Sequence, residues 1–282
     1  MKDYHLGVYE KSMPNSLCIK QKLNIAKQAG FDFLEMSIDE TKIKLDRLYY
    51  SAELRNDIKF AIIEERFPIK TICLSGHRKY SMGSNDKTIE LKSMEIMRKA
   101  IDFANDIGVR IIQLAGYDVY YEESSCTTKK RFFDNLRHAS ELASSAGIIL
   151  ALETMENDFM NTCEKAMQYV QMIDSPYLGL YPDTGNITNA TKDVEADLRT
   201  GKGHIFAAHL KETIDGYFRE IPYGAGHTDF PKVIRVLRSM GVNLFLCEFW
   251  YDGTSEPLTY IRAAHDFIRH QFDKAVENRK GD

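Results

Sequence analysis

The sequence predicts an α/β protein whose eight parallel strands close into one (β/α)8 barrel, and two features lead to this prediction. Eight short apolar runs alternate with helical patterns along the 282 residues, about 35 residues per unit. Several helical patterns end in a glycine directly before the next apolar run, at Gly30, Gly108, Gly147 and Gly241. Because glycine readily adopts the left-handed conformation that ends a helix, these are the short helix-to-strand connections of parallel α/β folds.

The predicted strands follow the apolar runs in chain order. They cover about residues 5–9, 31–37, 69–75, 109–114, 148–153, 178–182, 205–210 and 244–249. Each run has the length and apolar character of a strand that is buried on both faces, as expected in a parallel sheet.

Helices are predicted between the strands. The clearest covers about residues 86–107, where Met94, Met97 and Ile101 recur at three- and four-residue spacing. Another is predicted near 229–240, because Asp229 is a suitable N-cap and a proline follows in the first turn.

No linker or low-complexity stretch divides the chain, so we expect a single barrel domain over residues 1–282, with a solvated tail over about 276–282. A doubly wound open sheet is the alternative fold. That fold usually carries a glycine-rich phosphate loop after its first strand. Residues 7–14 contain only one glycine, Gly7, so the barrel is favoured.

The composition restricts the classes of function. The net charge is −4 and no basic block stands out, which gives no support to a nucleic-acid partner. The five cysteines include no CxxC pair, as is usual for reduced thiols in the cytosol. The N-terminus has no signal-peptide pattern and no run of about 18 apolar residues could span a bilayer. We therefore expect a cytoplasmic protein without a membrane partner.

Four strands in the second half of the chain each end in a side chain that can hold a divalent metal. These are Glu153, Asp183, His209 and Glu248, at intervals of 30, 26 and 39 residues. A single charged residue at a strand end usually meets only solvent, but a barrel brings the carboxyl ends of neighbouring strands to one mouth. Three carboxylates and one imidazole form a ligand set that accepts Zn²⁺, Mn²⁺ or Co²⁺.

Basic side chains near the same strand ends are candidate contacts to substrate oxygens or a phosphate. His77 and Arg78 follow the third strand, and Lys211 lies two residues past the predicted histidine ligand. Arg219 lies in the next loop, near where barrels often hold a phosphate. Solvated loop positions are the alternative for all four residues.

Two further side chains are candidate substrate contacts. Asn186 lies three residues past Asp183 and could form a hydrogen bond with a sugar hydroxyl. Tyr9 ends the first strand and could close the apolar side of the pocket.

The four ligands, together with the run Asp183-Thr184-Gly185-Asn186, resemble the xylose-isomerase-like TIM barrels, which include ketose 3-epimerases. Longer stretches narrow the resemblance to the bacterial L-ribulose-5-phosphate 3-epimerases, also called L-xylulose-5-phosphate 3-epimerases. Some relatives carry the label hexulose-6-phosphate isomerase. The matching stretches are residues 6–11, 30–40, 73–78, 113–121 and 222–226, the last reading Pro222-Tyr223-Gly224-Ala225-Gly226.

The resemblance implies the roles of the site residues. Glu153 and Glu248 would each bind the metal and act as one of the two bases that invert C3 of a 2-ketose through an enediolate. Asp183 and His209 would be ligands only. The resemblance also implies Zn²⁺ first and Mn²⁺ second, a phosphorylated ketopentose substrate, a homodimer, and a role in pentose and ascorbate breakdown.

Three other classes of function are alternatives to the epimerase. A DNA-repair nuclease on this type of barrel would have a histidine in place of Asn186 and another at the end of the fourth strand, where Gln113-Leu114-Ala115 stands. An aldose–ketose isomerase or a dehydratase would share the metal and the carboxylates, so the residues alone leave this alternative open. A non-enzymatic sugar-binding protein should lack one of the two bases, and both are present.

Overall fold

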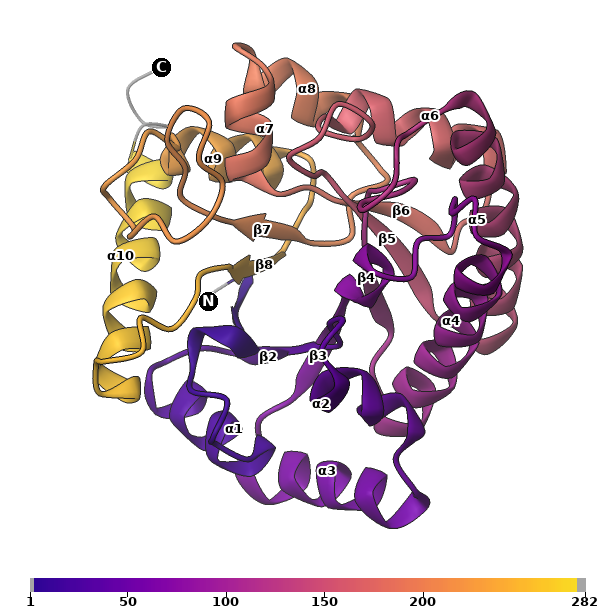
Figure 1. The fold of residues 1–282 in the computed structure, drawn as a ribbon. Coiled ribbons are helices and arrows are strands. Elements are labelled where there is room, and N and C mark those ends of the chain that lie inside the picture. The colour runs from indigo at the N-terminus through magenta and orange to yellow at the C-terminus, as the bar shows by residue number, and fades with distance from the viewer. Residues whose placement is uncertain (1–2, 278–282) are drawn as a thin grey trace.

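The computed structural model describes residues 3–277, in which eight parallel strands form a barrel with helices around its outside (Figure 1). The strands neighbour one another in the order β6-β5-β4-β3-β2-β1-β8-β7, and every ladder is parallel. The predicted (β/α)8 fold is therefore confirmed. The strands are β1 His5–Tyr9, β2 Phe33–Ser37, β3 Ile69–Leu74, β4 Ile111–Ala115, β5 Ile149–Glu153, β6 Leu178–Tyr181, β7 Ala208–Leu210 and β8 Leu244–Cys247.

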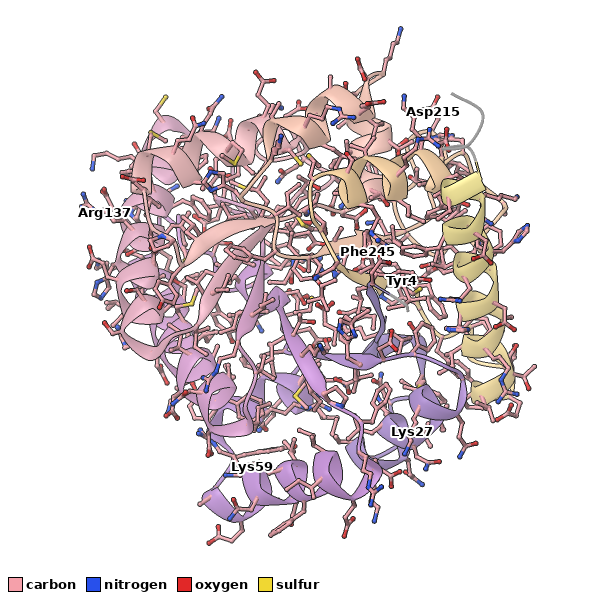
Figure 2. The ribbon with its side chains drawn as sticks, turned by 180° about the vertical axis from the view of Figure 1, so that it is seen from behind. Tyr4, Lys27, Lys59, Arg137, Asp215 and Phe245 are labelled. Carbon is pink, nitrogen blue, oxygen red and sulfur yellow. The ribbon has the colours of Figure 1, made fainter. Side chains whose placement is uncertain are left out.

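The helices cover the barrel from outside, and Figure 2 shows Lys27, Lys59 and Arg137 at the periphery, with Phe245 nearer the centre. The α-helices are α1 Ile19–Gln28, α2 Lys42–Leu45, α3 Ala52–Glu65, α4 Lys87–Ile107, α5 Cys126–Ala146, α6 Cys163–Ile173, α7 Thr184–Ala190, α8 Val194–Thr200, α9 Phe230–Ser239 and α10 Pro257–Glu277. Short 3₁₀ turns follow three of these elements. η1 Glu10–Ser12 follows β1, η2 Asp46–Tyr49 follows α2, and η3 Ser75–Arg78 follows β3. No helix of the described chain is both long and apolar enough to cross a bilayer.

The predicted helix boundaries agree with the structure. The Asp86 side chain caps α4, and the Asp229 side chain caps α9 by accepting a hydrogen bond from the backbone N–H of Lys232. Gly108 ends α4 at φ +82° and Gly147 ends α5 at φ +67°, the conformation that favours glycine. Helix α10 continues to Glu277, so the first part of the expected tail is helical, and residues 278–282 lie outside the described part of the chain.

One predicted strand is shorter than expected. The run 205–210 was predicted as a strand, but β7 contains only Ala208–Leu210. The seam between β6 and β7 is held by isolated bridges that join Leu180 to Ile205 and Asp183 to His209. Pro182 lies between these bridges and has no N–H to donate, so a continuous ladder cannot form there.

The barrel interior has an apolar floor beneath a polar layer at the mouth. On β2 the side chains of Phe33 and Glu35 are two residues apart and therefore point to the same face, and both are fully buried. The Phe33 ring lies so close to Gly7 that a Cβ added there would be 2.3 Å from the ring. Glycine at position 7 thus lets an aromatic floor close the barrel directly under the polar layer.

A buried ion cluster holds the mouth end of β1 and β2 together. The Glu10 carboxylate accepts hydrogen bonds from Lys22 Nζ at 3.0 Å, from Lys44 Nζ, from both terminal nitrogens of Arg47 at 2.5 and 2.8 Å, and from the Ser37 N–H at 2.9 Å. Burial by itself raises the pKa of Glu10, but the three cations outweigh it and hold that pKa well below its usual value. This cluster therefore joins β1, β2, α1 and α2 through one carboxylate.

Candidate metal centre and active site

The four predicted metal ligands converge at the carboxyl ends of the strands. Ligand atoms of Glu153, Asp183, His209 and Glu248 all lie within 4.8 Å of one another, and all four side chains are buried. Glu153 is the last residue of β5, Asp183 follows β6, His209 lies in β7 and Glu248 directly follows β8. The barrel thus brings together residues from four consecutive strands, as the sequence predicted.

The imidazole of His209 presents Nδ1 to this cluster. Nδ1 lies 2.7 Å from Glu153 Oε1 and 3.4 Å from Glu248 Oε2. Nε2 lies on the other side of the ring, 2.9 Å from Glu35 Oε1. The Tyr181 ring packs edge-on against the imidazole, with centroids 4.6 Å apart. Nδ1 is therefore the nitrogen of His209 that can bind a metal.

Glu35 is a site residue that the sequence analysis did not identify. Its second oxygen accepts hydrogen bonds from Thr71 Oγ1 at 2.7 Å and from Tyr181 Oη at 3.1 Å, and the whole side chain is buried. An imidazole ligand commonly donates its other N–H to a carboxylate, which fixes the tautomer and orients the ring. The available signal was a carboxylate inside the apolar run of β2, which is costly unless it has a partner.

Further polar contacts hold the carboxylates in place. Gln113 Nε2 donates a hydrogen bond to Glu153 Oε2. Lys211 Nζ lies 2.6 Å from Asp183 Oδ2, 2.8 Å from Asn186 Oδ1 and 3.6 Å from Glu248 Oε2. Lys211 and Asn186 therefore lie beside the metal ligands, where they can orient Asp183 as well as contact a substrate.

The charges of the site fit a bound divalent cation. Four carboxylates are buried here, those of Glu35 and the three acidic ligands, against at most two cations, Lys211 and a protonated His209. Burial and the neighbouring carboxylates raise the pKa of Asp183 to about 8. Burial by itself lowers the pKa of His209, but the surrounding carboxylates raise it well above its usual value. Buried carboxylates in such number need a counter-charge, and metal binding supplies one and releases the protons that otherwise compensate them.

Two ligand oxygens also lack a well-formed hydrogen bond, although the Lys211 ammonium pairs with one of them, Asp183 Oδ2. Within residues 3–277, neither Asp183 Oδ2 nor Glu248 Oε2 accepts a hydrogen bond of good geometry, although both are sheltered from solvent. Buried polar atoms are rarely left without a partner in folded proteins. The donor set, with its poorly satisfied oxygens, thus fits a metal ion held by Glu153, Asp183, His209 and Glu248.

A cavity of about 90 Å³ lies above the ligands at the barrel mouth. Among the predicted substrate contacts, five line this cavity: Tyr9, Arg78, Asn186, Lys211 and Arg219. Phe218 and Trp250 form part of its apolar wall, and Lys11 and Glu156 are polar residues of its lining that the sequence analysis did not identify.

His77 is placed elsewhere. Its side chain is buried, and Nε2 lies 3.1 Å from the backbone oxygen of Ser93 in α4. Burial lowers the pKa of this imidazole to about 4, so the ring is neutral at pH 7. His77 does not line the mouth cavity, and only its neighbour Arg78 reaches it.

The basic groups at the mouth already have partners. Arg219 Nη2 donates a hydrogen bond to Glu156 Oε1 at 3.2 Å, and Tyr117 Oη donates one to Glu156 Oε2 at 2.5 Å. The Arg78 guanidinium lies over the Tyr120 ring, 5.0 Å from its centroid. Lys11 Nζ lies 2.5 Å from Asp39 Oδ2. These contacts hold the cations around the cavity rather than leaving them extended into solvent.

The fold and the convergent ligand set define a xylose-isomerase-like barrel, and comparison with known proteins agrees. A family model described as "Xylose isomerase-like TIM barrel" matches residues 23–271, so the chain belongs to this family. The L-ribulose-5-phosphate 3-epimerase UlaE of Escherichia coli (strain SMS-3-5) is 42% identical over 275 residues, which cover 97% of each chain. A protein of the same name from Escherichia fergusonii shows the same identity and coverage. Both relatives are named as 3-epimerases, which are isomerases, so the chain is an enzyme of the isomerase class.

Solved structures share the fold at lower sequence identity. A structure of L-ribulose 3-epimerase superposes with a TM-score of 0.80 at 18% identity, over 98% of this chain and 97% of that one. D-psicose 3-epimerase from Clostridium cellulolyticum, solved with D-tagatose, gives a TM-score of 0.79 at 17% identity, over 94% and 98% of the two chains. These similarities concern the arrangement of the barrel and its loops.

Proposed function

We propose that this protein is a metal-dependent 3-epimerase that interconverts L-ribulose 5-phosphate and L-xylulose 5-phosphate. The observation that carries the proposal is the placement of Glu153 and Glu248 within 3.4 Å of His209 Nδ1, both lining one small cavity. The 42% identity to a relative named as an L-ribulose-5-phosphate 3-epimerase supports this choice of substrate.

Inversion at C3 requires two groups that exchange a proton with opposite faces of the substrate. The C3 proton lies next to the C2 carbonyl, so its removal leaves an enediolate. Glu153 ends β5 and Glu248 follows β8, with β6 and β7 between them in the barrel wall, so their carboxylates would approach the cavity from different sides. One would remove the C3 proton and the other would deliver a proton to the opposite face.

A divalent ion bound by Glu153, Asp183, His209 and Glu248 would act as a Lewis acid toward the substrate oxygens. The resemblance implies Zn²⁺ first and Mn²⁺ second, and the ligand set also accepts Co²⁺. The protein's other groups position the reacting ones. Gln113 fixes one oxygen of Glu153, which leaves the orientation of that base defined.

The substrate's phosphate would lie at the basic rim of the cavity. Arg78 and Arg219 can offer charge-assisted hydrogen bonds there, and Lys11 adds a further positive charge. Asn186 and Lys211 lie deeper, next to Asp183, where sugar hydroxyls would bind. Tyr9 would form the apolar side of the pocket. This arrangement places the phosphate at the mouth and the reacting carbon near the two glutamates.

The proposal also includes a single domain over residues 1–282, a homodimer, a cytoplasmic location and a role in pentose or ascorbate breakdown. The described cysteines are all unpaired, which agrees with a reducing compartment. The homodimer and the pathway are what the resemblance implies.

The test is proton NMR of L-ribulose 5-phosphate incubated with the metal-loaded protein in D2O, with and without a chelator. The expected result is L-xylulose 5-phosphate carrying deuterium at C3, with loss of the reaction after chelation. Deuterium at C1 with an aldose product would instead establish an aldose–ketose isomerase, such as a hexulose-6-phosphate isomerase. Absence of exchange in the metal-loaded protein would refute this substrate.

The two glutamates are tested separately. We expect Glu153→Gln and Glu248→Gln each to abolish turnover, because each change removes a base and weakens a metal ligand. The exposed Glu123, in the loop after β4, offers a control with the same change, Glu123→Gln, which should leave the rate unaltered. More than about a tenth of the wild-type rate in either active-site variant, a loss below ~1.4 kcal/mol, would contradict the two-base assignment.

A further inference from the structure

A buried carboxylate lies at the base of the long loop that joins β7 to α9, residues 211–229. Glu212 is 3% exposed, and no cation of the described chain lies within ion-pair distance of it. Its Oε1 accepts hydrogen bonds from the N–H groups of Thr213 at 3.1 Å and Thr228 at 3.0 Å. Its Oε2 accepts one from the Gly224 N–H at 3.0 Å. One side chain thus binds backbone from both ends of the loop.

The loop is folded tightly around this carboxylate. Gly224 has φ +84°, a conformation that favours glycine. A Cβ added to Gly226 would lie 2.2 Å from the Thr213 oxygen and 2.5 Å from Glu212 Oε1. Tyr223 Oη donates a hydrogen bond to the Leu210 oxygen at 2.5 Å. The sequence run Pro222-Tyr223-Gly224-Ala225-Gly226 therefore has a physical role, since its glycines allow the backbone to approach Glu212.

The segment between these anchor points carries two residues of the active-site cavity. Phe218 and Arg219 both line the mouth cavity, although Glu212 does not. Thr213 Oγ1 donates a hydrogen bond to the Tyr217 oxygen at 2.7 Å, so the segment that bears Phe218 is tied directly to the anchored part of the loop. Displacement of the anchor would consequently displace the cavity wall.

We propose that Glu212 is a positioning residue that fixes the β7–α9 loop so that Phe218 and Arg219 close the substrate cavity. The carboxylate acts through its three backbone contacts and does not touch the reacting atoms. The consequence for a phosphorylated ketose rests on the proposed function, whereas the anchoring itself does not.

Glutamine is the informative substitution because it has the size of glutamate but only one acceptor oxygen. In Glu212→Gln the NH2 of the side-chain amide would face either the Gly224 N–H or the N–H groups of Thr213 and Thr228, so donors would oppose donors. The matched control is Asp215→Asn, which removes the same charge from an exposed residue of the same loop, near the edge of the molecule (Figure 2).

The first readouts need no substrate. Trp250 is the only tryptophan of the chain and lines the mouth cavity, so its fluorescence reports on the cavity wall. In Glu212→Gln we expect faster hydrogen exchange at the Gly224 and Thr228 amides, by about tenfold or more. We also expect stronger quenching of Trp250 by acrylamide, with metal content equal to wild type. Asp215→Asn should match wild type in all three measurements.

The kinetic readout uses L-ribulose 5-phosphate. We expect Glu212→Gln to raise KM by about tenfold with kcat nearly unchanged, because substrate binding loses a preformed wall. Arg219→Ala should raise KM in the wild type but much less in the Glu212→Gln background, since a displaced Arg219 contributes little.

Two outcomes would overturn the proposal. In the first, Glu212→Gln leaves both amide exchange and Trp250 quenching unchanged. In the second, Glu212→Gln alters amide exchange but leaves KM unchanged, and the effect of Arg219→Ala on KM is the same in the variant as in the wild type. If Glu212→Gln fails to fold, Gly226→Ala disturbs the same contact from the backbone side and must give the same pattern. If the wild-type protein does not convert the ketose 5-phosphate, the proposed function fails, while exchange and quenching still test the anchor.

Discussion

The role of Glu35 can be tested by one change of a single atom. Glu35 Oε1 lies 2.9 Å from His209 Nε2, so with a metal bound Nε2 would donate to Glu35 and the lone pair of Nδ1 would bind the ion. In Glu35→Gln, an amide nitrogen facing the imidazole would require Nε2 to accept, so Nδ1 would carry the proton and could not bind a metal. The opposite amide orientation would place the nitrogen against the hydroxyls of Thr71 and Tyr181, which both donate in the native site.

The structure allows the size of the effect to be stated. Loss of the outer partner of a metal-binding histidine typically weakens metal affinity by about 10–100-fold. Each factor of ten corresponds to about 1.4 kcal/mol of binding free energy. Glu35 and His209 are both completely buried, so solvent cannot replace the lost acceptor. We therefore expect the upper part of this range, about 100-fold weaker binding of Zn²⁺ or about 2.7 kcal/mol.

The assay is competition for Zn²⁺ between the protein and a fluorescent chelator, with the melting temperature measured in parallel. The control is Glu40→Gln, in the loop after β2, where the glutamate accepts a hydrogen bond from Tyr121 Oη away from the metal ligands. This control should retain wild-type affinity. A folded Glu35→Gln variant that binds Zn²⁺ within about threefold of wild type, less than ~0.7 kcal/mol, would refute the claim that Glu35 sets the tautomer of His209.

Two further predictions concern the buried ion cluster around Glu10. Glu10→Gln should lower the free energy of unfolding by about 3–5 kcal/mol, because it leaves three buried cations without a counter-charge. Glu64→Gln, which breaks the exposed pair with Lys20, should leave the free energy of unfolding nearly unchanged, and urea unfolding would separate the two variants. Equal midpoints would show that Glu10 does not stabilise the fold. Since its pKa lies below its usual value of 4.5, the stability that Glu10 contributes is complete above that pH and is lost as pH falls toward the folded-state pKa. Urea midpoints measured from about pH 6 down to pH 3 should therefore fall more steeply for wild type than for Glu10→Gln.

The convergence of the four candidate metal ligands could be predicted from the sequence because the prediction needed only strand ends. Any barrel brings the carboxyl ends of its strands to one mouth, whatever its finer geometry. The role of Glu35 as the partner of His209 could not be predicted in the same way. The two residues are 174 positions apart in the sequence, and their contact depends on strand register. An acid inside an apolar strand signals a buried partner but does not identify it.

His77 shows a second limit of predicting site residues from their position at strand ends. It and Arg78 both follow β3, and the sequence suggested that both face the substrate. The structure places them in the 3₁₀ turn η3, Ser75–Arg78, where neighbouring side chains point about 120° apart. Arg78 consequently lines the cavity while His77 points toward α4. Local turn geometry, which composition does not specify, decides which of two adjacent residues reaches a site.

The partnered cations at the mouth bear on how a phosphate would bind. Arg219 already contacts Glu156, and Lys11 already contacts Asp39, so an arriving phosphate would share or replace an existing carboxylate partner. The affinity gained at each cation is then the difference between two charge-assisted contacts rather than the full value of one. In return, the carboxylates keep the basic groups in place around the cavity before substrate arrives, which lowers the entropy lost on binding. Selectivity for a phosphorylated ketose would therefore arise from several preformed but individually modest contacts, which is why the position of the loop that carries Arg219 matters for binding.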